Sequence, residues 1–258
     1  MGQFALGQSV PRTEDPRLLR GDGRYVDDIR LLDECHAFML RSPHAHARIV
    51  SLDCSIARRM PGIIAIFTGE DWVADGHGQH PAGHNRVRRD GSPLYVPTRH
   101  AIAYQEVKVT GDIVAMIVAE TVNQGKDAAE TILIEYDLLP VITEGTQATA
   151  NGAPLLHEGC DNNESYFYTA GNKEAVEDTI NTAYHVTRLQ TKINRITANT
   201  MEPRSCIGDF DHRFSRYILM GGTQRPHLLR KTLAVDVFGV PETAVKMITP
   251  DVGGSFGM

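Results

Sequence analysis

Residues 217–257 carry the pattern that most restricts the fold, because strand-like runs alternate there with glycine-rich turns. Apolar runs at 217–220 and 245–249 predict two short strands, and the sequence after each run is rich in glycine. If the two strands are parallel neighbours, both glycine-rich turns lie at the same edge of one sheet. Open α/β sheets bind ligands at that edge, outside the carboxyl ends of the strands.

One helix is expected between these strands, and its limits are well marked. Thr223 is a candidate N-cap, Pro226 suits the first helical turn, and apolar side chains recur with helical spacing up to Phe238. Gly239 then supplies a stop that is typical of helix C-termini. The pattern predicts a helix over residues 226–238.

The upstream sequence predicts an α+β domain that ends near residue 142. Strand patterns lie at 35–40, 47–52, 63–67, 106–109 and 113–119, and helix formers cluster at 126–133. Residues 74–97 are rich in glycine, proline and arginine and have no period, which predicts a long surface loop. After a turn-rich linker, the second domain is predicted to begin with a helix at 174–183 and strands at 184–196 and 205–210.

Composition excludes several classes of protein. The 258 residues suffice for two domains, 41% are hydrophobic, 22% are charged, and the formal net charge is -6. This charge leaves no basic surplus for nucleic acid or a membrane surface, and the sequence shows no secretory signal or membrane-spanning run. Four scattered cysteines without a Cys-x-x-Cys pair argue against an iron–sulfur cluster in this chain. We expect a cytoplasmic protein that binds neither nucleic acid nor a membrane.

The two glycine-rich turns allow a structural and a functional interpretation. Neither has the spacing of a nucleotide-binding fingerprint, so both could be tight turns that need positive φ. In the functional interpretation, Gln224 donates its amide to a ligand at a helix N-terminus. The backbone from Gly254 to Gly257 forms the other wall, and Phe256 adds an apolar face unless it is an ordinary core aromatic.

The sequence ends at Met258, inside the second glycine-rich stretch. Glycine lets main-chain N–H groups approach a bulky anion, and a functional protein rarely ends in such a loop. We therefore expect the 258 residues to be the front part of a larger enzyme, cut within its cofactor-binding region.

A histidine-rich stretch offers a different possibility. His77, His80 and His84 lie within eight residues and could ligate zinc. The stretch has no Cys, Asp or Glu ligand at a fixed spacing, so a solvated loop is the favoured interpretation.

Motifs in a fixed order along nearly the whole chain add a family resemblance. They include Arg41 to Ile49, Met201 to Arg204, Thr223 to His227 and Pro250 to Gly257, together with segments 11–19, 23–28, 61–62, 68–69, 152–154 and 156–158. With these motifs the chain resembles the molybdenum-binding large subunit of the xanthine dehydrogenase, aldehyde oxidase and carbon monoxide dehydrogenase family. The order and spread of the motifs make this resemblance far more specific than any one of them.

The resemblance implies a fold class and a domain order. The implied class is α+β, with an aldehyde oxidase/xanthine dehydrogenase-type α/β hammerhead domain followed by the start of a molybdopterin-binding α/β domain. Residues 1–142, which include an N-terminal lead, would form the hammerhead domain. Residues 143–165 would be a linker, and residues 166–258 a truncated first part of the molybdopterin-binding domain.

The resemblance also implies site residues. Gln224 matches the glutamine that hydrogen-bonds an oxo ligand of molybdenum, and Gly254, Ser255, Phe256 and Gly257 match the loop that lies against the metal and the pterin. Ser255 stands where glycine is more usual, which would narrow backbone freedom at the cofactor. Glu202 does not match a catalytic base, so we interpret it as a structural carboxylate. The general-base glutamate of the family is expected beyond Met258, so no catalytic residue is assigned in this chain.

By this resemblance the chain is part of a molybdenum hydroxylase large subunit. Such an oxidoreductase hydroxylates an aldehyde or N-heterocycle, or oxidises carbon monoxide, with oxygen derived from water. The implied cofactor is molybdenum–molybdopterin in its cytosine dinucleotide form, with an incomplete site here. The implied partners are an iron–sulfur subunit, a FAD subunit and a small-molecule substrate, in a dimer of heterotrimers. The alternative is a non-catalytic folding or subunit-docking fragment without bound cofactor, and the 258 residues alone are expected to be inactive.

Overall fold

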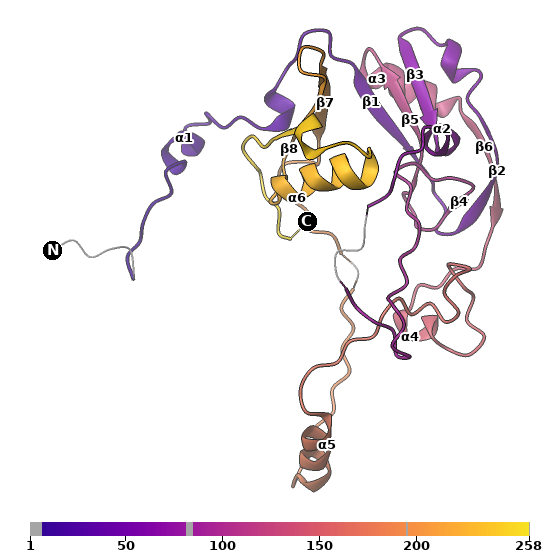
Figure 1. The fold of residues 1–258 in the computed structure, drawn as a ribbon, viewed down its shortest axis with the longest axis vertical. Coiled ribbons are helices and arrows are strands. Elements are labelled where there is room, and N and C mark those ends of the chain that lie inside the picture. Colours follow the sequence, from indigo (N-terminus) through magenta and orange to yellow (C-terminus); the bar gives the residue numbers. More distant parts are fainter. Residues whose placement is uncertain (1–6, 81–84, 195, 258) are drawn as a thin grey trace. The chain divides into compact units, whose positions relative to one another are not determined.

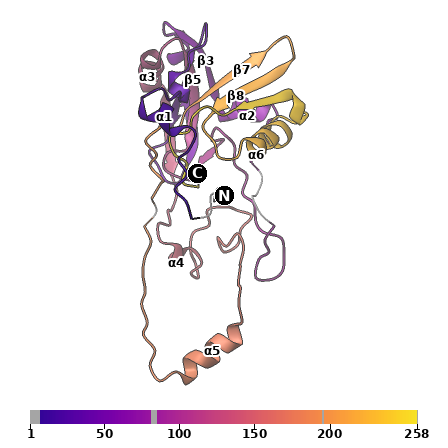
Figure 2. The same cartoon turned by 90° about the vertical axis from the view of Figure 1, so that its left-hand side faces the viewer.

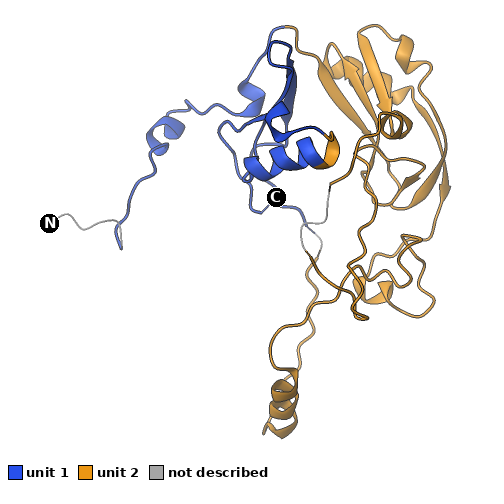
Figure 3. Ribbon diagram, in the orientation of Figure 1, with its two compact units in different colours: residues 1–32, 196–235, 240–258 blue, residues 33–195, 236–239 orange. Residues whose placement is uncertain are grey.

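The computed structural model describes residues 7–80, 85–194 and 196–257 (Figure 1). The chain divides into two compact units, each assembled from separate stretches of sequence (Figure 3). Unit 1 comprises residues 1–32, 196–235 and 240–258, and unit 2 comprises residues 33–195 and 236–239. The N-terminal lead therefore belongs to the same compact unit as the glycine-rich turns.

Unit 2 contains a three-stranded antiparallel sheet in the order β1-β5-β3. Its strands are β1 (His36–Arg41), β5 (Ile113–Ala119) and β3 (Ile63–Thr68). The central strand β5 is the continuous apolar run predicted from the sequence, and its side chains are largely buried because a neighbour flanks it on each side. Helix α3 (Val122–Glu130) packs against all three strands, and the hydroxyl of Thr121 caps its N-terminus.

A second antiparallel sheet of unit 2 has the order β4-β2-β6. It consists of β4 (Glu106–Val107), β2 (Ala47–Asp53) and β6 (Leu133–Leu138). Ala47 and Val107 pack with Val114 of β5 in a small core, and each of the three residues is 0% exposed. The predicted helix at 126–133 is placed too late, because the helix ends at Glu130 and Leu133 begins β6.

The remaining elements of unit 2 are short. They are the 3₁₀ helix η2 (Ala57–Arg59) and helices α2 (Gly69–Ala74), α4 (Gly145–Ala148) and α5 (Lys173–Thr182). The described residues between α2 and residue 97 contain no helix or strand beyond two isolated bridges that Val87 makes with Pro93 and Phe167, which confirms the predicted loop. Helix α5 confirms the helix predicted at 174–183. Figure 2 shows α5 between two long segments that are drawn as neither helix nor strand.

The strand predicted at 184–196 is wrong. The described residues from 184 to 194 form neither strand nor helix, and residue 195 lies outside the described residues. Tyr184, Leu189 and Ile193 are 107%, 85% and 93% exposed. A strand needs a partner for its backbone N–H and C=O groups, and this stretch pairs with no other described segment.

Unit 1 is built on a sheet in the order β7-β8-β9. Strands β7 (Cys206–Asp211) and β8 (Arg216–Gly221) form an antiparallel hairpin, and β9 (Val245–Ile248) pairs with β8 in parallel. The crossover from β8 to β9 runs through α6 (Pro226–Lys231), the π-helical segment η3 (Thr232–Val237) and the 3₁₀ helix η4 (Glu242–Ala244). The helical extent predicted at 226–238 is confirmed, although its second half is π-helical.

The N-terminal part of unit 1 contributes two short elements, helix α1 (Asp15–Leu19) and the 3₁₀ helix η1 (Val26–Asp28). Pro16 lies in the first turn of α1, where a missing N–H is tolerated, and Asp28 accepts the N–H of Tyr25 at the start of η1. No helix in the described part of the chain is long and apolar enough to cross a membrane.

Candidate functional site

The parallel pairing of β8 and β9 brings the two glycine-rich turns to one edge of the sheet. Tyr217 lies opposite Val245, and the register continues to Met220 opposite Ile248. Both strands therefore point the same way and end at the same level. The predicted arrangement, in which both turns lie at the carboxyl edge, is confirmed.

Gln224 lies in the first turn, between β8 and α6. Gln224 is exposed, and helix α6 begins two residues later with Pro226. Thr223 is not the N-cap, which is Arg225 without a side-chain cap. Instead the Thr223 hydroxyl accepts the backbone N–H of Arg225 at 3.2 Å, which fixes the turn one residue before the helix.

Glu202 lies between the two turns. Its Oε2 atom accepts the backbone N–H of Gly253 at 2.7 Å, and a Cβ placed on Gly222 would lie 3.6 Å from the same atom. Its Oε1 atom accepts the N–H of Val26 at 3.4 Å. These contacts agree with the expectation of a structural carboxylate, because the Glu202 side chain accepts hydrogen bonds from the backbone of two distant segments, at Val26 and Gly253.

The two turns use glycine for different reasons. The φ angles of Gly221, Gly222 and Gly253 lie outside the left-handed region, so the interpretation of the first turn as one that needs positive φ is wrong. In the second turn, Gly254 has φ 120° and Gly257 has φ 89°. That turn does require positive φ.

The second turn also places two side chains that the sequence singled out. Phe256 has φ 49°, an uncommon value for a bulky residue, and its side chain is 78% exposed. It is therefore not a core aromatic in this chain, and its ring is available as an apolar face. Ser255 does not have positive φ, so the serine at this position costs no backbone strain.

Asp251 anchors the backbone between β9 and the second turn, and the sequence did not identify this role. Arg17 donates two hydrogen bonds of 2.6 Å to its two carboxylate oxygens, and the N–H of Arg24 donates a third at 2.7 Å. The Arg17 guanidinium and, after it, the Arg24 N–H lower the pKa of Asp251 from 3.8 to about 2. Arg17 and Asp251 each lie in a motif of the sequence, in segments 11–19 and 250–257. Nothing in the sequence indicates that these two residues, 234 positions apart, form a pair.

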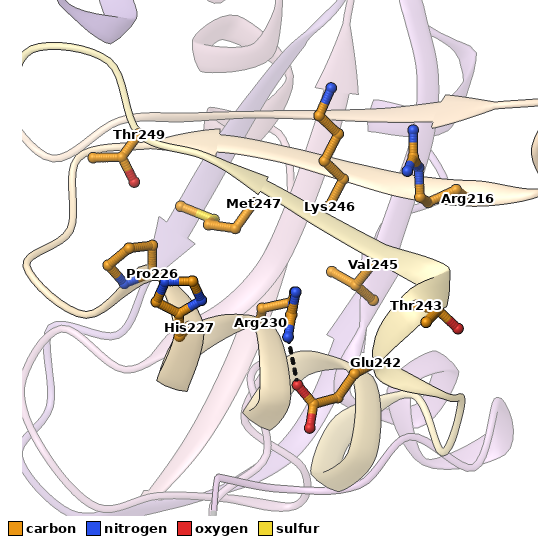
Figure 4. Close-up of a pocket in the computed structure, with 10 residues that line it drawn as sticks. All are labelled: Arg216, Pro226, His227, Arg230, Glu242, Thr243, Val245, Lys246, Met247 and Thr249. Carbon is orange, nitrogen blue, oxygen red and sulfur yellow. Dashed lines mark hydrogen bonds and ion pairs between the residues drawn. The ribbon is translucent and has the colours of Figure 1, made fainter.

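A cavity of about 510 Å³ lies beside α6 and β9 in unit 1 (Figure 4). Arg216, Arg230 and Lys246 contribute positive charge to its lining, and Arg230 pairs with Glu242 at 2.8 Å. Its lining does not include Gln224 or the second glycine-rich turn. The candidate site is therefore the open edge above the strands and not this cavity.

The histidine-rich loop does not form a metal site among the described residues. No three His, Cys, Asp or Glu side chains come together there, or elsewhere in the described part of the chain, in a group that could hold a metal ion. His77 lies against the rings of Trp72 and Phe238, and its Nε2 atom is 3.8 Å from Asp75. His84 lies outside the described residues.

Two family models match consecutive parts of this sequence. Residues 20–140 match the aldehyde oxidase and xanthine dehydrogenase a/b hammerhead domain. Residues 156–258 match the molybdopterin cofactor-binding domain. The hammerhead match covers both sheets of unit 2, and the cofactor-domain match covers the β7-β8-β9 sheet and both glycine-rich turns.

Individual proteins agree with the family models. The nicotine 6-hydroxylase large subunit of Paenarthrobacter nicotinovorans is 31% identical over 98% of this chain and 30% of its own length. The carbon monoxide dehydrogenase large chain of Afipia carboxidovorans is 29% identical over 98% of this chain and 31% of its own. The solved quinoline 2-oxidoreductase of Pseudomonas putida 86 matches with a TM-score of 0.85 and 32% identity, over 97% of this chain and 31% of that one. The chain thus spans about a third of the length of these relatives.

Proposed function

Since the chain belongs to the family of molybdenum-binding large subunits that includes the xanthine dehydrogenases, aldehyde oxidases and carbon monoxide dehydrogenases, we propose that its two glycine-rich turns form part of a molybdenum–molybdopterin site. The complete protein would then be an oxidoreductase. Its hammerhead domain, expected over residues 1–142, and its cofactor domain, expected from residue 166, would be joined by the linker at 143–165.

The observation that carries this proposal is the parallel register of β8 and β9. It places Gln224 and the turn from Gly253 to Gly257 at one carboxyl edge, where open α/β sheets bind ligands. The donors at this edge suit the cofactor, because an exposed side-chain amide can hydrogen-bond an oxo ligand and an exposed ring can lie against a pterin. Glu202 is directed at backbone N–H groups and is therefore not available as a proton acceptor for substrate.

The roles proposed for individual residues are orientation and electrostatic stabilisation. Gln224 donates its amide to an oxo ligand of the metal, while Gly254, Ser255, Phe256 and Gly257 form the wall against the metal and the pterin. When bound, the cofactor would supply the redox chemistry of substrate oxidation. None of the described residues is assigned as the general base.

The substrate, the partners and the form of the cofactor belong to the proposal for the complete protein. The relatives are named for nicotine, carbon monoxide and quinoline, which supports a small-molecule substrate of the N-heterocycle or carbon monoxide type. An aldehyde substrate rests on the family resemblance alone. We infer a cytosine dinucleotide form of molybdopterin, and iron–sulfur and FAD subunits in a dimer of heterotrimers. The scattered cysteines, none of them in a Cys-x-x-Cys pair, support iron–sulfur centres held outside these 258 residues. A cytoplasmic location stays a prediction from the sequence.

Replacing Gln224 tests the site. In the complete enzyme with its partner subunits, Gln224→Ala is expected to lower turnover by about 100-fold or more, because removing one preorganised donor from a reacting centre has an effect of that size. Turnover is measured together with molybdenum content. Gln147→Ala, which truncates an exposed glutamine in α4, is the control and should leave both quantities unchanged. Unchanged molybdenum content and turnover in Gln224→Ala would refute the role of this residue.

The alternative, a non-catalytic folding or subunit-docking module, makes a different prediction. A module of that kind would assemble with partner subunits but contain no molybdenum in the purified complex. Elemental analysis of the wild-type complex separates the two functions before any variant is made.

A further inference from the structure

The second glycine-rich turn leaves β9 through Asp251, whose carboxylate is held by the N-terminal segment of the chain. Arg17 binds both of its oxygens at 2.6 Å, and the N–H of Arg24 binds Oδ2 at 2.7 Å. The N–H of Asp251 donates in return to the carbonyl of Arg24 at 3.2 Å. A bidentate pair with a planar guanidinium fixes the orientation of the carboxylate as well as its distance from the arginine. The backbone direction after β9 is therefore fixed at Asp251.

A second anchor lies two residues further along. The N–H of Gly253 donates to Glu202 at 2.7 Å, and the side chain of Glu202 fills the space where a Cβ of Gly253 would be. The Thr200 hydroxyl donates to the carbonyl of Glu202, which restrains the anchor itself. The backbone is therefore fixed at Asp251 and again at Gly253.

One of the residues that follow, Phe256, has a backbone conformation that needs such support. Gly254, Phe256 and Gly257 have φ of 120°, 49° and 89°. A sparsely populated conformation at a non-glycine residue such as Phe256 persists only when its surroundings hold it. The fixed start of the turn limits the conformations available to the rest.

We propose that Arg17, Asp251 and Glu202 form a loop clasp that holds the backbone from Gly253 to Gly257 in the conformation that receives the cofactor. The inference rests on the proposed cofactor site and deepens it. The three residues are positioning residues, because they bond one another or the backbone and act on the cofactor only through the turn. The N-terminal lead would then contribute to cofactor retention although its arginine is distant in sequence.

The test uses the complete holoenzyme and three variants, Arg17→Met, Asp251→Asn and the double variant. Molybdenum per large subunit is measured after prolonged dialysis, together with the line positions of the molybdenum(V) electron paramagnetic resonance signal. Each single variant is expected to retain the metal about tenfold less well, or worse, as is typical when an outer residue that orients a metal site is lost. The double variant should lose no more metal than the more severe of the two single variants, because both substitutions remove the same ion pair.

Two further variants separate the clasp from general destabilisation. Arg17→Lys keeps the charge but loses the planar fork, so it should retain an intermediate amount of metal. Arg12→Met removes the comparable ion pair with Asp15, which lies in the same N-terminal lead but does not contact the turn, and should behave as wild type. Hydrogen exchange in peptides from β7 to β9 shows whether each variant has kept the sheet.

The outcomes are distinct. Wild-type metal retention and an unchanged spectrum in Arg17→Met and Asp251→Asn would overturn the clasp and leave the proposed function intact. Additive losses accompanied by faster exchange throughout β7 to β9 would also overturn it, because they indicate a merely structural role. A wild-type enzyme complex that is purified without molybdenum would overturn the proposed function itself.

Discussion

Gly253 has no room for a side chain. An added Cβ would overlap the Cβ of Glu202 and lie 3.2 Å from its Oε2 atom. The φ of Gly253 is outside the left-handed region, so the constraint is steric and does not come from the backbone conformation. The close approach lets Glu202 reach the N–H of Gly253, and the geometry of the second turn depends on it.

Gly253→Ala is expected to lower the free energy of unfolding of unit 1 by about 1–3 kcal/mol, the usual cost of forcing an extra carbon into a packed site. The change is measured by urea denaturation, with hydrogen exchange in β7 to β9 reporting on this unit. Gly208→Ala in β7 is the matched control, because an added Cβ there meets nothing within 4 Å and the φ is ordinary. Equal effects of the two substitutions would show that the contact with Glu202 is unimportant.

At the scale of elements, α3 illustrates how a single cap supports a packed helix. Thr121 accepts the N–H of Gln124 at 3.2 Å and donates to the side chain of the same residue at 2.8 Å. Ala128 and Ala129 of the same helix are buried in a core cluster with Ala115 and Ile117 of β5. A frayed N-terminus would weaken that packing, because helix stability in proteins comes mainly from the buried face.

Thr121→Ala is therefore expected to lower the free energy of unfolding of unit 2 by about 1 kcal/mol, the usual effect of losing a helix N-cap. Urea denaturation of the variant and the wild type measures the difference. Thr121→Ser keeps the hydroxyl and should remain close to wild type. A serine variant as unstable as the alanine variant would mean that packing of the threonine methyl, and not the cap, is responsible.

At the scale of the whole molecule, unit 1 joins stretches that are far apart in sequence. Residues 1–32 share it with residues 196–235 and 240–258, and the ion pair of Arg17 with Asp251 lies within it. The ion pair is partly buried and is supported by the N–H of Arg24. Its contribution to stability should therefore depend on the charge of Asp251.

The pH dependence follows from the pKa of Asp251, which is about 2 in the folded chain and ordinarily 3.8. Because the folded pKa is the lower one, the stabilising effect is fully present above pH 3.8 and is lost as the pH falls towards 2. The difference in the free energy of unfolding between wild type and Asp251→Asn should shrink over that interval. Urea denaturation at several pH values measures it.

Asp15→Asn is the control for this titration, since it removes an exposed ion pair with Arg12 in the same N-terminal lead. Exposed salt bridges contribute little, so the control should differ little from wild type at any pH. A difference between wild type and Asp251→Asn that stays constant from pH 5 to 2 would contradict the assigned pKa.

The sequence alone determined the helices and strands that depend on the residues within them and directly beside them. The apolar run at 113–119 became the central strand β5 without a shift of boundary, and the helix beginning at Pro226 followed from local stop and start signals. The family resemblance also depended only on sequence, and the two family models agree with it. The sequence predicted that both glycine-rich turns share one edge if β8 and β9 are parallel neighbours. Parallel pairing was the expected arrangement, because two strands joined through a helix are usually parallel.

Only the tertiary structure decided the features that depend on distant partners. Residues 184–194 have strand-like composition but form no strand pairing with any other described segment, and local pattern does not reveal whether a partner strand exists. Likewise, nothing near Arg17 in the sequence indicates Asp251, and nothing near Glu202 indicates Gly253. Hydrogen bonds act over about 3 Å in space. Which donors and acceptors come within that range is determined by the folded chain as a whole, and these contacts hold the second turn of the candidate site.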